Sequence, residues 1–442
     1  MVNPPATTVD ATEFAAAGKK AAQPRVGRMA HGLIGSEILK IAAEIRALQR
    51  AGRSICNLTV GDFDPAQFPI PTRLREAIVA AYGRGETNYP PSDGVLALRE
   101  AVQRFYRREL GIDYPLGSVL IASGARPIIH AAYAAVCDPG DKVVYPVPSW
   151  NNNHYTHMVG AEPVPIPCAP TTRFLPTRAQ IEAALPGARL VCINSPLNPT
   201  GTAIDPEELR GICKSIVAEN EARERRGERP AFLLYDQIYF MLRVGDTVHA
   251  TPPALVPEMA RYTIFVDGIS KAFASTGVRV GWGVGPVDVI ERMSAIVGHV
   301  GAWAPRAEQI ATAELLDDTT AIGEYILPFR AGIQERLVRL HDGLEEMGRS
   351  GLPVEALPPM GAIYLTARIA PFGRRTPDGI ALQTNEDIRR YLLEAAGVGV
   401  VPFQAFGCSG EDGWFRLSIG AVGLAEIDAA LPRLAHALRQ LR

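Results

Sequence analysis

The central part of the chain, from about residue 119 to residue 284, alternates short apolar runs with stretches of helical periodicity. Several runs are apolar throughout and lack the polar alternation of a half-exposed strand, as expected for strands that are covered on both faces. Strands that alternate with helices predict an α/β fold with a mostly parallel sheet. The predicted strands are residues 119–122, 142–145, 190–193, 232–235, 263–266 and 279–284.

The flanking regions carry other patterns. Residues 34–45 predict an amphipathic helix that is capped by Ser36, and Ile55 to Val60 predicts a short strand that ends at Gly61. Further helices are predicted at residues 72–82 and 94–110 and over a long stretch from about 307 to 348, and the chain from residue 352 onward mixes strand-like pieces (362–365, 399–401, 414–419) with helices (385–396, 424–441).

These elements predict four segments. Residues 1–28 are rich in Ala, Pro and Thr and predict a flexible tail, with a tail that wraps a partner subunit as the alternative. No apolar stretch in this tail resembles the core of a secretory signal. Residues 71–335 predict a large sheet domain, and residues 336–442 predict a smaller α+β domain that is joined by the N-terminal segment 29–70.

Composition narrows the class of protein. The 442 residues are 47% hydrophobic and 21% charged, which suits a soluble globular chain with a large core. Lys plus Arg is 45 against 47 for Asp plus Glu, so the charge balance favours neither nucleic acid nor an anionic membrane as a partner. No apolar run reaches the length of a transmembrane helix. The cysteines lack C-x-x-C spacing, which predicts reduced thiols in the cytoplasm and neither disulfides nor a metal site: Cys56, Cys137, Cys168, Cys192, Cys213 and Cys408.

The segment 267–282 carries the strongest chemical signal. Lys271 follows Ser270 and precedes Arg279 by eight residues, in a run that is otherwise mostly small and apolar. Burying a charged lysine among apolar residues costs free energy unless the lysine pairs with an opposite charge or has a chemical function. Burial lowers the pKa of a lysine, and a neutral amine forms a Schiff base with an aldehyde. Because Ser270 and Arg279 suit a phosphate, the segment predicts pyridoxal 5'-phosphate, an aldehyde that carries a phosphate.

Polar residues also follow the predicted strands, at the edge where α/β sheets bind ligands. The relevant stretches are Ser123–Pro127, Asn194–Gly201, Asp236–Tyr239 and Ser270–Lys271. A further motif, Phe415–Ile419, places an arginine inside the otherwise apolar strand-like piece 414–419. On these motifs the chain resembles the class I and II aminotransferases of pyridoxal-phosphate fold type I, close to the aspartate aminotransferase branch. The resemblance covers about residues 31–440, with the motifs in consistent order.

The resemblance implies roles around the cofactor ring. Lys271 matches the Schiff-base lysine, whose free amine later moves a proton between the substrate Cα and the cofactor. Asp236 matches the carboxylate that keeps the pyridine nitrogen protonated. Tyr239 and Asn198 match the residues that contact the phenolic oxygen. The family usually has Glu where this chain has Gln237, and we expect little effect because that position does not contact the cofactor directly.

The resemblance also implies how the phosphate is held. Ser123, Gly124, Ala125 and Arg126 match the turn that opens a helix, where backbone N–H groups and the positive helix end bind the phosphate. Arg126-Pro127 departs from the common pattern, so only backbone contacts carry over there. Tyr89 matches a tyrosine that reaches the phosphate from the neighbouring subunit, which implies a homodimer with shared active sites.

On the substrate side, the resemblance assigns three anchors. Trp150 matches the aromatic residue that stacks on the pyridine ring, and Arg416 matches the arginine that binds the substrate α-carboxylate as a bidentate fork. Gly61 matches a glycine whose backbone lines the substrate site. Asn198 matches a residue that also contacts the substrate. The residues that follow, Asp62-Phe63-Asp64-Pro65, depart from the commoner Gly-x-Pro-Asp-Phe.

Side-chain selectivity is left open by the sequence. A dicarboxylate substrate needs a second cation, for which His299 and Arg306 are candidates. The alternative is that Arg306 begins a helix and faces solvent, and Trp303 could instead favour aromatic side chains.

The sequence therefore predicts a dimeric aminotransferase that uses pyridoxal 5'-phosphate. Its expected substrates are an L-amino acid, aspartate first and aromatic amino acids second, and a 2-keto acid such as 2-oxoglutarate. A C–S or β-lyase on the same scaffold is the alternative. A regulator with a fused DNA-binding domain is a further alternative, but the N-terminal tail lacks the length and basic helix-turn-helix pattern it would need.

Overall fold

The structure is a computed structural model that describes residues 26–35 and 37–442, apart from the side chain of Leu39. The described residues divide into two units, residues 26–35 and 37–442. The first contains α2 (Arg28–Gly32), and the other helices and strands of the described residues belong to the second. Ser36, the predicted helix cap, and residues 1–25 of the predicted tail lie outside the described residues, and Arg28 begins α2.

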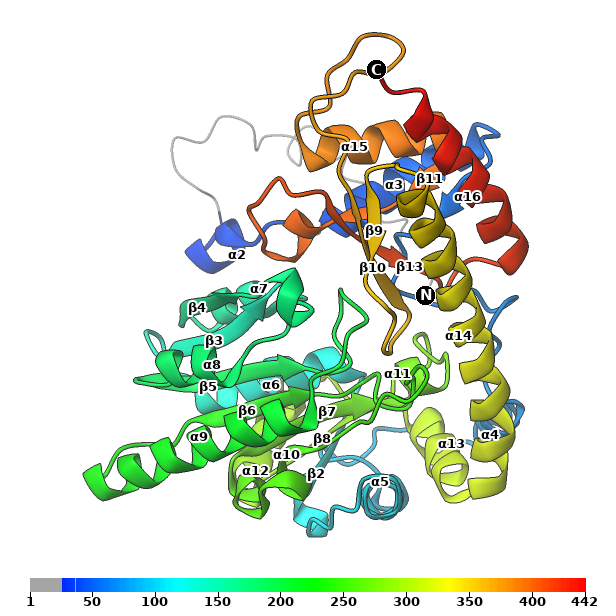
Figure 1. Ribbon diagram of the computed structural model, residues 1–442. Coiled ribbons are helices and arrows are strands. Elements are labelled where there is room, and N and C mark those ends of the chain that lie inside the picture. Colours follow the sequence, from blue (N-terminus) through cyan, green and yellow to red (C-terminus); the bar gives the residue numbers. More distant parts are fainter. Residues whose placement is uncertain (1–25, 36) are drawn as a thin grey trace, which may run out of the picture. The chain divides into compact units, whose positions relative to one another are not determined.

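A seven-stranded sheet is the largest feature of the second unit (Figure 1). Its strands have the order β2-β8-β7-β6-β5-β3-β4, and all neighbours are parallel except the two pairs that involve β8. The predicted mostly parallel α/β fold is therefore confirmed. The strands are β2 (Val119–Ala122), β3 (Lys142–Val147), β4 (Glu162–Pro167), β5 (Ala188–Asn194), β6 (Phe232–Asp236), β7 (Thr263–Gly268) and β8 (Gly281–Val284).

Both faces of this sheet are covered, which explains the continuous apolar runs. On one face, Leu120, Leu190 and Ile264 pack in a core with α6 (Ala125–Val136) and α12 (Val287–Val300). Alternate residues point into the other core, which α9 (Pro206–Arg226) and α5 (Leu96–Leu110) complete. The remaining helices of this region are α4 (Thr72–Gly83), α7 (Asn152–Met158), α8 (Arg178–Ala184), α10 (Pro252–Leu255), α11 (Ile269–Ala272) and α13 (Arg306–Asp317).

A smaller four-stranded antiparallel sheet has the order β12-β13-β10-β9. Figure 1 shows it beside the long helix α14, with α15 and α16 near it. A two-stranded parallel pair, β1 with β11, joins the early chain to this late part. The bounds are β1 (Cys56–Asn57), β9 (Val354–Ala356), β10 (Tyr364–Ile369), β11 (Val398–Gly399), β12 (Val401–Pro402), β13 (Trp414–Ser418), α3 (Glu37–Arg50), α14 (Thr319–Arg349), α15 (Asn385–Tyr391) and α16 (Leu424–Arg439), with a π-helical turn at Leu392–Ala396. The predicted domain boundaries stay a prediction.

Several predicted elements differ in extent. The long helical stretch 307–348 is two helices, because the side chain of Asp318 accepts the Ala321 N–H and begins α14. The strand predicted at 279–284 begins only at Gly281, since Arg279 has a left-handed backbone with φ +64°. The predicted strand 55–60 has two residues, because the Asn57 side chain accepts bonds from Thr59 and turns the chain.

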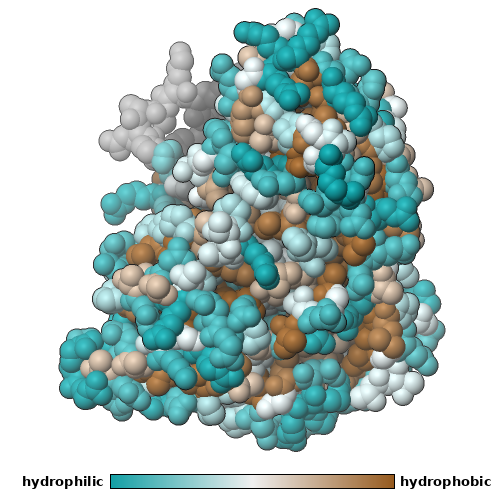
Figure 2. All heavy atoms as spheres, viewed as in Figure 1, coloured by the Kyte–Doolittle hydropathy of each residue, from teal (hydrophilic) through white to brown (hydrophobic). Residues whose placement is uncertain are grey.

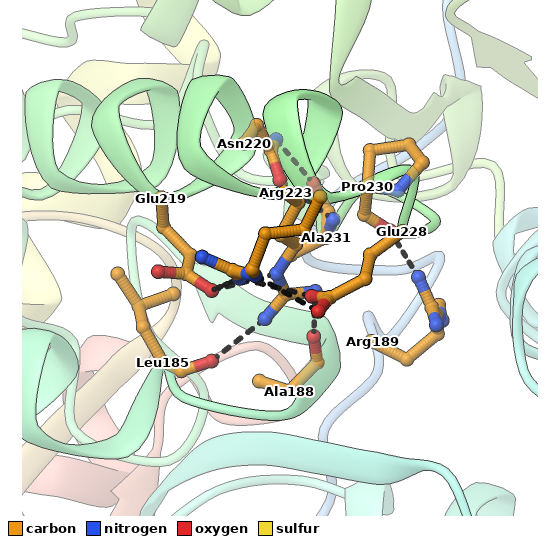
Figure 3. A network of polar contacts seen from close by, with 10 residues as sticks. Leu185, Ala188, Arg189, Glu219, Asn220, Arg223, Glu228, Pro230 and Ala231 are labelled. Atoms are coloured by element: carbon orange, nitrogen blue, oxygen red, sulfur yellow. Dashed lines mark hydrogen bonds and ion pairs between the residues drawn. The ribbon is translucent and has the colours of Figure 1, made fainter.

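A polar network fixes α9 at the edge of the sheet where the strands begin (Figure 3). The buried Arg223 donates to the backbone oxygens of Ala188, at 2.6 Å, and Leu185, at 2.9 Å, and to the Glu219 carboxylate. Asn220 exchanges two hydrogen bonds with the backbone of Ala231. These contacts satisfy backbone groups at the edge opposite the strand ends where the predicted site residues lie.

The face of the molecule in Figure 2 carries mostly hydrophilic residues with scattered hydrophobic ones. Among the described residues, no helix combines the length and the apolar character that a membrane span requires. The six cysteines are free, and five of them are buried.

Candidate active site

Lys271 lies on the short helix α11, which directly follows the end of β7. Its Nζ donates a hydrogen bond of 2.6 Å to the backbone oxygen of Gly61 and lies 5.8 Å from the ring centre of Phe63 and 6.0 Å from that of Tyr239. Burial lowers the pKa of the Lys271 amine to about 8, against a smaller opposing effect of the Asp62 carboxylate. A larger share of the amine is therefore neutral near physiological pH than in an exposed lysine.

Arg279 and the start of α6 form a cationic cradle at the end of β2. The Arg279 guanidinium donates to the backbone oxygens of Thr276, at 2.7 Å, and Ser123, at 2.8 Å. Gly124 has φ +95°, and a side-chain carbon there would lie 2.4 Å from the nearer guanidinium nitrogen, so only glycine fits. No side chain caps α6, which leaves its first N–H groups available next to the cation. The buried Ser270 precedes the lysine.

Asp236 ends β6, paired in register with Asn194 at the end of β5. Its carboxylate accepts the Ile238 N–H at 3.1 Å, and no cation among the described residues pairs with it. Burial raises the pKa of this carboxyl to about 6. A carboxyl group with these surroundings suits a cationic ligand atom, which would favour its charged form.

The Asp236 pKa gives an expected pH dependence of stability. In the cofactor-free protein its pKa of about 6 lies above the ordinary value of 3.8, so the folded state holds this proton more tightly than the unfolded state. The free energy of unfolding should then fall as pH rises from about 4 to 6, by about 3 kcal/mol from this group. Urea denaturation of wild type and Asp236→Asn at each pH isolates the contribution of Asp236 to the free energy of unfolding. The contributions of the other carboxyl groups cancel in the difference between the two proteins. A difference between the two proteins that is constant with pH would contradict the assignment.

Arg416, on β13, is a fully buried cation with only 1% of its surface exposed. Its guanidinium donates to the Asn198 side-chain oxygen at 3.1 Å and to the Thr59 backbone oxygen at 2.6 Å, and lies between the rings of Tyr364 (4.7 Å) and Phe406 (4.9 Å). Its Nε has no partner, and no carboxylate among the described residues pairs with it. A buried cation without a counter-ion is costly, so an anionic ligand is expected here.

Hydrogen bonds and ring contacts connect these groups into one site. Asn194 donates to the Asp236 backbone oxygen and accepts the Asn198 N–H, and Asn198 in turn accepts from Arg416. A second connection runs from Lys271, near the Tyr239 ring, to Arg416, near the Tyr364 ring, because the hydroxyls of the two tyrosines lie 2.8 Å apart. The structure thus brings together the predicted Lys271, Asp236, Asn198, Tyr239, Gly61 and Arg416.

Two members of this site were missed in the sequence. Tyr364 was seen only as part of a strand-like piece, and Asn194 only as the start of the motif that contains Asn198. A tyrosine hydroxyl inside an otherwise apolar strand needs a buried polar partner, which was the available signal for Tyr364.

Trp150 and Arg126 lie together at the same end of the sheet. The Arg126 guanidinium is 4.5 Å from the centre of the Trp150 ring, an attractive arrangement of a cation over an aromatic face. Arg126 is exposed, and its side chain makes no hydrogen bond or ion pair with another described residue. Its positive charge reaches the site, since it helps to lower the pKa of Lys271 and of Arg279.

Three predicted residues lie apart from this cluster. Tyr89 is 81% exposed, and its ring lies in an edge-to-face arrangement with that of Trp303, with ring centres 5.3 Å apart. His299 is exposed near the end of α12. Arg306 forms an ion pair with Glu86 at 2.7 Å, so its charge is already compensated.

These residues fit the predicted cofactor. A buried amine with a lowered pKa suits an aldehyde, the cradle of Arg279 and the α6 N-terminus suits a phosphate, and the unpaired Asp236 carboxyl suits a protonated ring nitrogen. The described residues contain no cluster of three or more potential metal ligands.

Comparison with known proteins identifies the family. The model of the family "Aminotransferase class I and II" matches residues 53–434. The chain is 33% identical to the aspartate aminotransferase of Rhizobium meliloti (strain 1021), over 92% of this chain and 94% of the relative. It is 32% identical to the probable aspartate/prephenate aminotransferase of Thermus aquaticus, over 90% and 96%. The crystal structure of the aspartate aminotransferase from Rhizobium meliloti superimposes with a TM-score of 0.86, at 32% identity, over 96% of this chain and all of that one.

Proposed function

Because this chain belongs to the class I and II aminotransferases of fold type I and uses pyridoxal 5'-phosphate, we propose that it transaminates dicarboxylic substrates, with aspartate as the preferred amino donor. The acceptor is a 2-keto acid such as 2-oxoglutarate. The observation that carries the transamination of an amino acid is the position of Gly61, whereas the preference for a dicarboxylate rests on Arg126. Its carbonyl accepts from Lys271 Nζ, and a side-chain carbon on it would lie 3.7 Å from the Arg416 guanidinium. A small amino acid can thus meet the amine and the buried cation together.

The cofactor would be held mainly by residues at the ends of five strands, β2, β3, β5, β6 and β7. We propose that Lys271 binds its aldehyde, Asp236 its ring nitrogen, and Tyr239 and Asn198 its phenolic oxygen, with Trp150 against the ring. The phosphate would lie against Arg279, Ser270 and the turn Ser123, Gly124, Ala125 and Arg126, the last through its backbone. When bound, the cofactor supplies an electrophilic carbon and an electron-withdrawing ring.

The protein's own groups then orient the substrate and move its proton. Arg416 binds the α-carboxylate as a fork, which places the substrate Cα near Lys271. The Lys271 amine takes the proton from that carbon, and its lowered pKa supports this role as a general base. Gly61 leaves space for the substrate, because any larger residue would meet the Tyr364 hydroxyl at 2.8 Å.

Arg126 is proposed as the cation for the distal carboxylate. The relatives' names include aspartate and prephenate, and each of these molecules carries a carboxylate besides the one next to its amino or keto carbon. The sequence candidates were His299 and Arg306, but Arg306 is neutralised by Glu86. Arg126 is exposed, makes no ion pair with another described residue, and lies on Trp150 at the cofactor ring.

The Arg126 assignment leads to a substrate-specific effect. Arg126→Gln should lower kcat/KM for aspartate by about 10- to 100-fold, since one charge-assisted contact is lost. The kcat/KM for phenylalanine or tyrosine should change by less than about threefold, because these lack the second carboxylate. Steady-state kinetics with each donor measures both. An equal loss for all donors would instead assign Arg126 to the cofactor.

A half-reaction screen tests the function. The absorbance of the lysine-bound cofactor is followed while each amino acid is added without a keto acid, and 2-oxoglutarate is then added to restore it. Aspartate should remove the absorbance fastest, with aromatic amino acids second. If no amino acid removes it, the proposed transamination is wrong. Sustained release of pyruvate or ammonia without a keto acid would favour the C–S or β-lyase instead.

We also propose a homodimer in the cytoplasm. The exposure of Tyr89 on a loop supports a role in a second subunit's phosphate site. The free, mostly buried cysteines support a reducing compartment. Mixing Tyr89→Ala with Lys271→Ala subunits tests the shared site. The mixed dimer would hold one intact site and regain activity, whereas no gain would place Tyr89 outside the partner's site.

A further inference from the structure

The loop Gly61–Asp64 is one of the segments that depart from the family pattern, and it contacts the catalytic lysine. Gly61 supplies the oxygen that accepts from Lys271 Nζ at 2.6 Å. A neutral amine has two N–H groups and one lone pair. A fixed acceptor for one N–H therefore limits how the amine can turn, and with it the direction of the lone pair that takes a proton.

The side chain of Asp62 connects this loop to the chain that follows the lysine. One of its oxygens, Oδ1, accepts the Thr276 hydroxyl at 2.6 Å and the Phe63 N–H at 2.8 Å. Thr276 is five residues beyond Lys271, and its backbone oxygen accepts from Arg279, which also holds the turn at Ser123. Asp62 thus joins the substrate-side loop to both the lysine segment and the cradle of Arg279.

The other end of the loop is fixed by Gly420, two residues beyond the end of β13, the strand that carries Arg416. The Asp64 N–H donates to the Gly420 backbone oxygen at 3.0 Å. A side-chain carbon on Gly420 would lie 2.1 Å from the Asp62 backbone oxygen, so the close approach requires glycine. On the other side of Gly61, the Val60 backbone oxygen accepts the Ser418 hydroxyl at 2.6 Å, and the Asp62–Thr276 bond is the side-chain contact that connects the loop to the segment after Lys271.

We propose that Asp62 is a positioning residue that, through its hydrogen bond with Thr276, holds the Gly61 carbonyl against the Lys271 amine and so orients the general base. This inference rests on the proposed function, and it adds a role for a residue outside the family motifs. Asp62 acts through Gly61 and touches neither the substrate nor the reacting atoms in this role.

Paired variants separate the effect of the Asp62–Thr276 hydrogen bond from the effect of the negative charge of Asp62. Asp62→Ala and Thr276→Val remove the hydrogen bond, whereas Asp62→Asn and Thr276→Ser keep an acceptor oxygen and a hydroxyl. The first two should lower the maximal rate of the aspartate half-reaction by about tenfold, with the apparent affinity within about twofold. The conservative pair should recover the rate to within about threefold of wild type. The double variant Asp62→Ala with Thr276→Val should lose no more than either single variant, because both remove the same bond.

A second measurement uses the cofactor-free protein. Hydrogen–deuterium exchange should become faster in both segments, residues 61–68 and 272–280, when either Asp62→Ala or Thr276→Val is made. Asp64→Ala, which removes a different bond of the same loop, should affect only the first segment.

Losses that multiply in the double variant, or an exchange change confined to residues 61–68, would overturn the inference. So would a rate in Asp62→Asn as low as in Asp62→Ala, since charge rather than position would then matter. Failure of the proposed function is distinct, because wild type itself would then leave the cofactor absorbance unchanged with every amino acid. In that case the hydrogen–deuterium exchange experiment still tests whether the Asp62–Thr276 hydrogen bond holds the two segments together.

Discussion

Replacing Lys271 with alanine is expected to lower the rate of transamination by about 10⁴-fold or more. The variant loses both the amine that binds the cofactor and the base that takes the substrate proton. Lys271 is suited to both tasks because burial brings its pKa to about 8, and no other lysine contacts Gly61 or Tyr239 among the described residues. Single-turnover absorbance measurements with saturating aspartate give the rate and the state of the cofactor together.

Two controls make the Lys271 experiment specific. Lys271→Arg keeps a cation but supplies no nucleophilic amine at neutral pH, so it should fail to link the cofactor and should be about as slow as Lys271→Ala. A small primary amine added to Lys271→Ala should restore part of the rate, because it can enter the space left by the side chain. If Lys271→Ala retains activity within about tenfold of wild type, the base lies elsewhere.

The sequence predicted the strands of the large sheet because burial on both faces requires continuous apolar runs. Residues 119–122 illustrate this, since Val119 and Ile121 enter one core while Leu120 and Ala122 enter the other. The strand β4 (Glu162–Pro167) was missed. It contains three prolines, which an edge strand tolerates because one of its sides needs no backbone donors.

The site was predictable where its residues end strands of a parallel sheet, because those ends meet at one edge. Asp236 and Ser270 lie at such ends, while Lys271 was singled out by its small, apolar surroundings and Asp236 received its role from the resemblance. The contacts that complete the site join residues far apart in the chain, such as Asp62 with Thr276 and Tyr239 with Tyr364. Neither periodicity nor spacing encodes such pairings. The sequence also left the distal cation open, and the ion pair between Arg306 and Glu86 is another contact between distant residues that spacing does not encode.

Arg416→Lys is expected to lower kcat/KM for aspartate and for 2-oxoglutarate by about 10²- to 10³-fold. The guanidinium is 1% exposed, held by Asn198 and Thr59 in a plane between two rings, and lacks a counter-ion among the described residues. Lysine keeps the charge but loses the planar fork, so the α-carboxylate would be held by one contact instead of two. Removing one of the hydrogen-bonding groups of a buried ion pair commonly lowers affinity or rate by a factor of this size. Steady-state kinetics in both directions measures the loss.

A substrate without the α-carboxylate provides the matched comparison for Arg416. A primary amine that lacks this group should react slowly with wild type and at a similar rate, within about threefold, with Arg416→Lys, since neither protein can use the fork. A loss that is equally large for that amine would mean that Arg416 instead maintains the position of Asn198, its hydrogen-bond partner at 3.1 Å. Asn198→Ala then distinguishes the two roles. If Arg416 binds the α-carboxylate directly, Asn198→Ala should retain most of the preference for carboxylated substrates while slowing all of them.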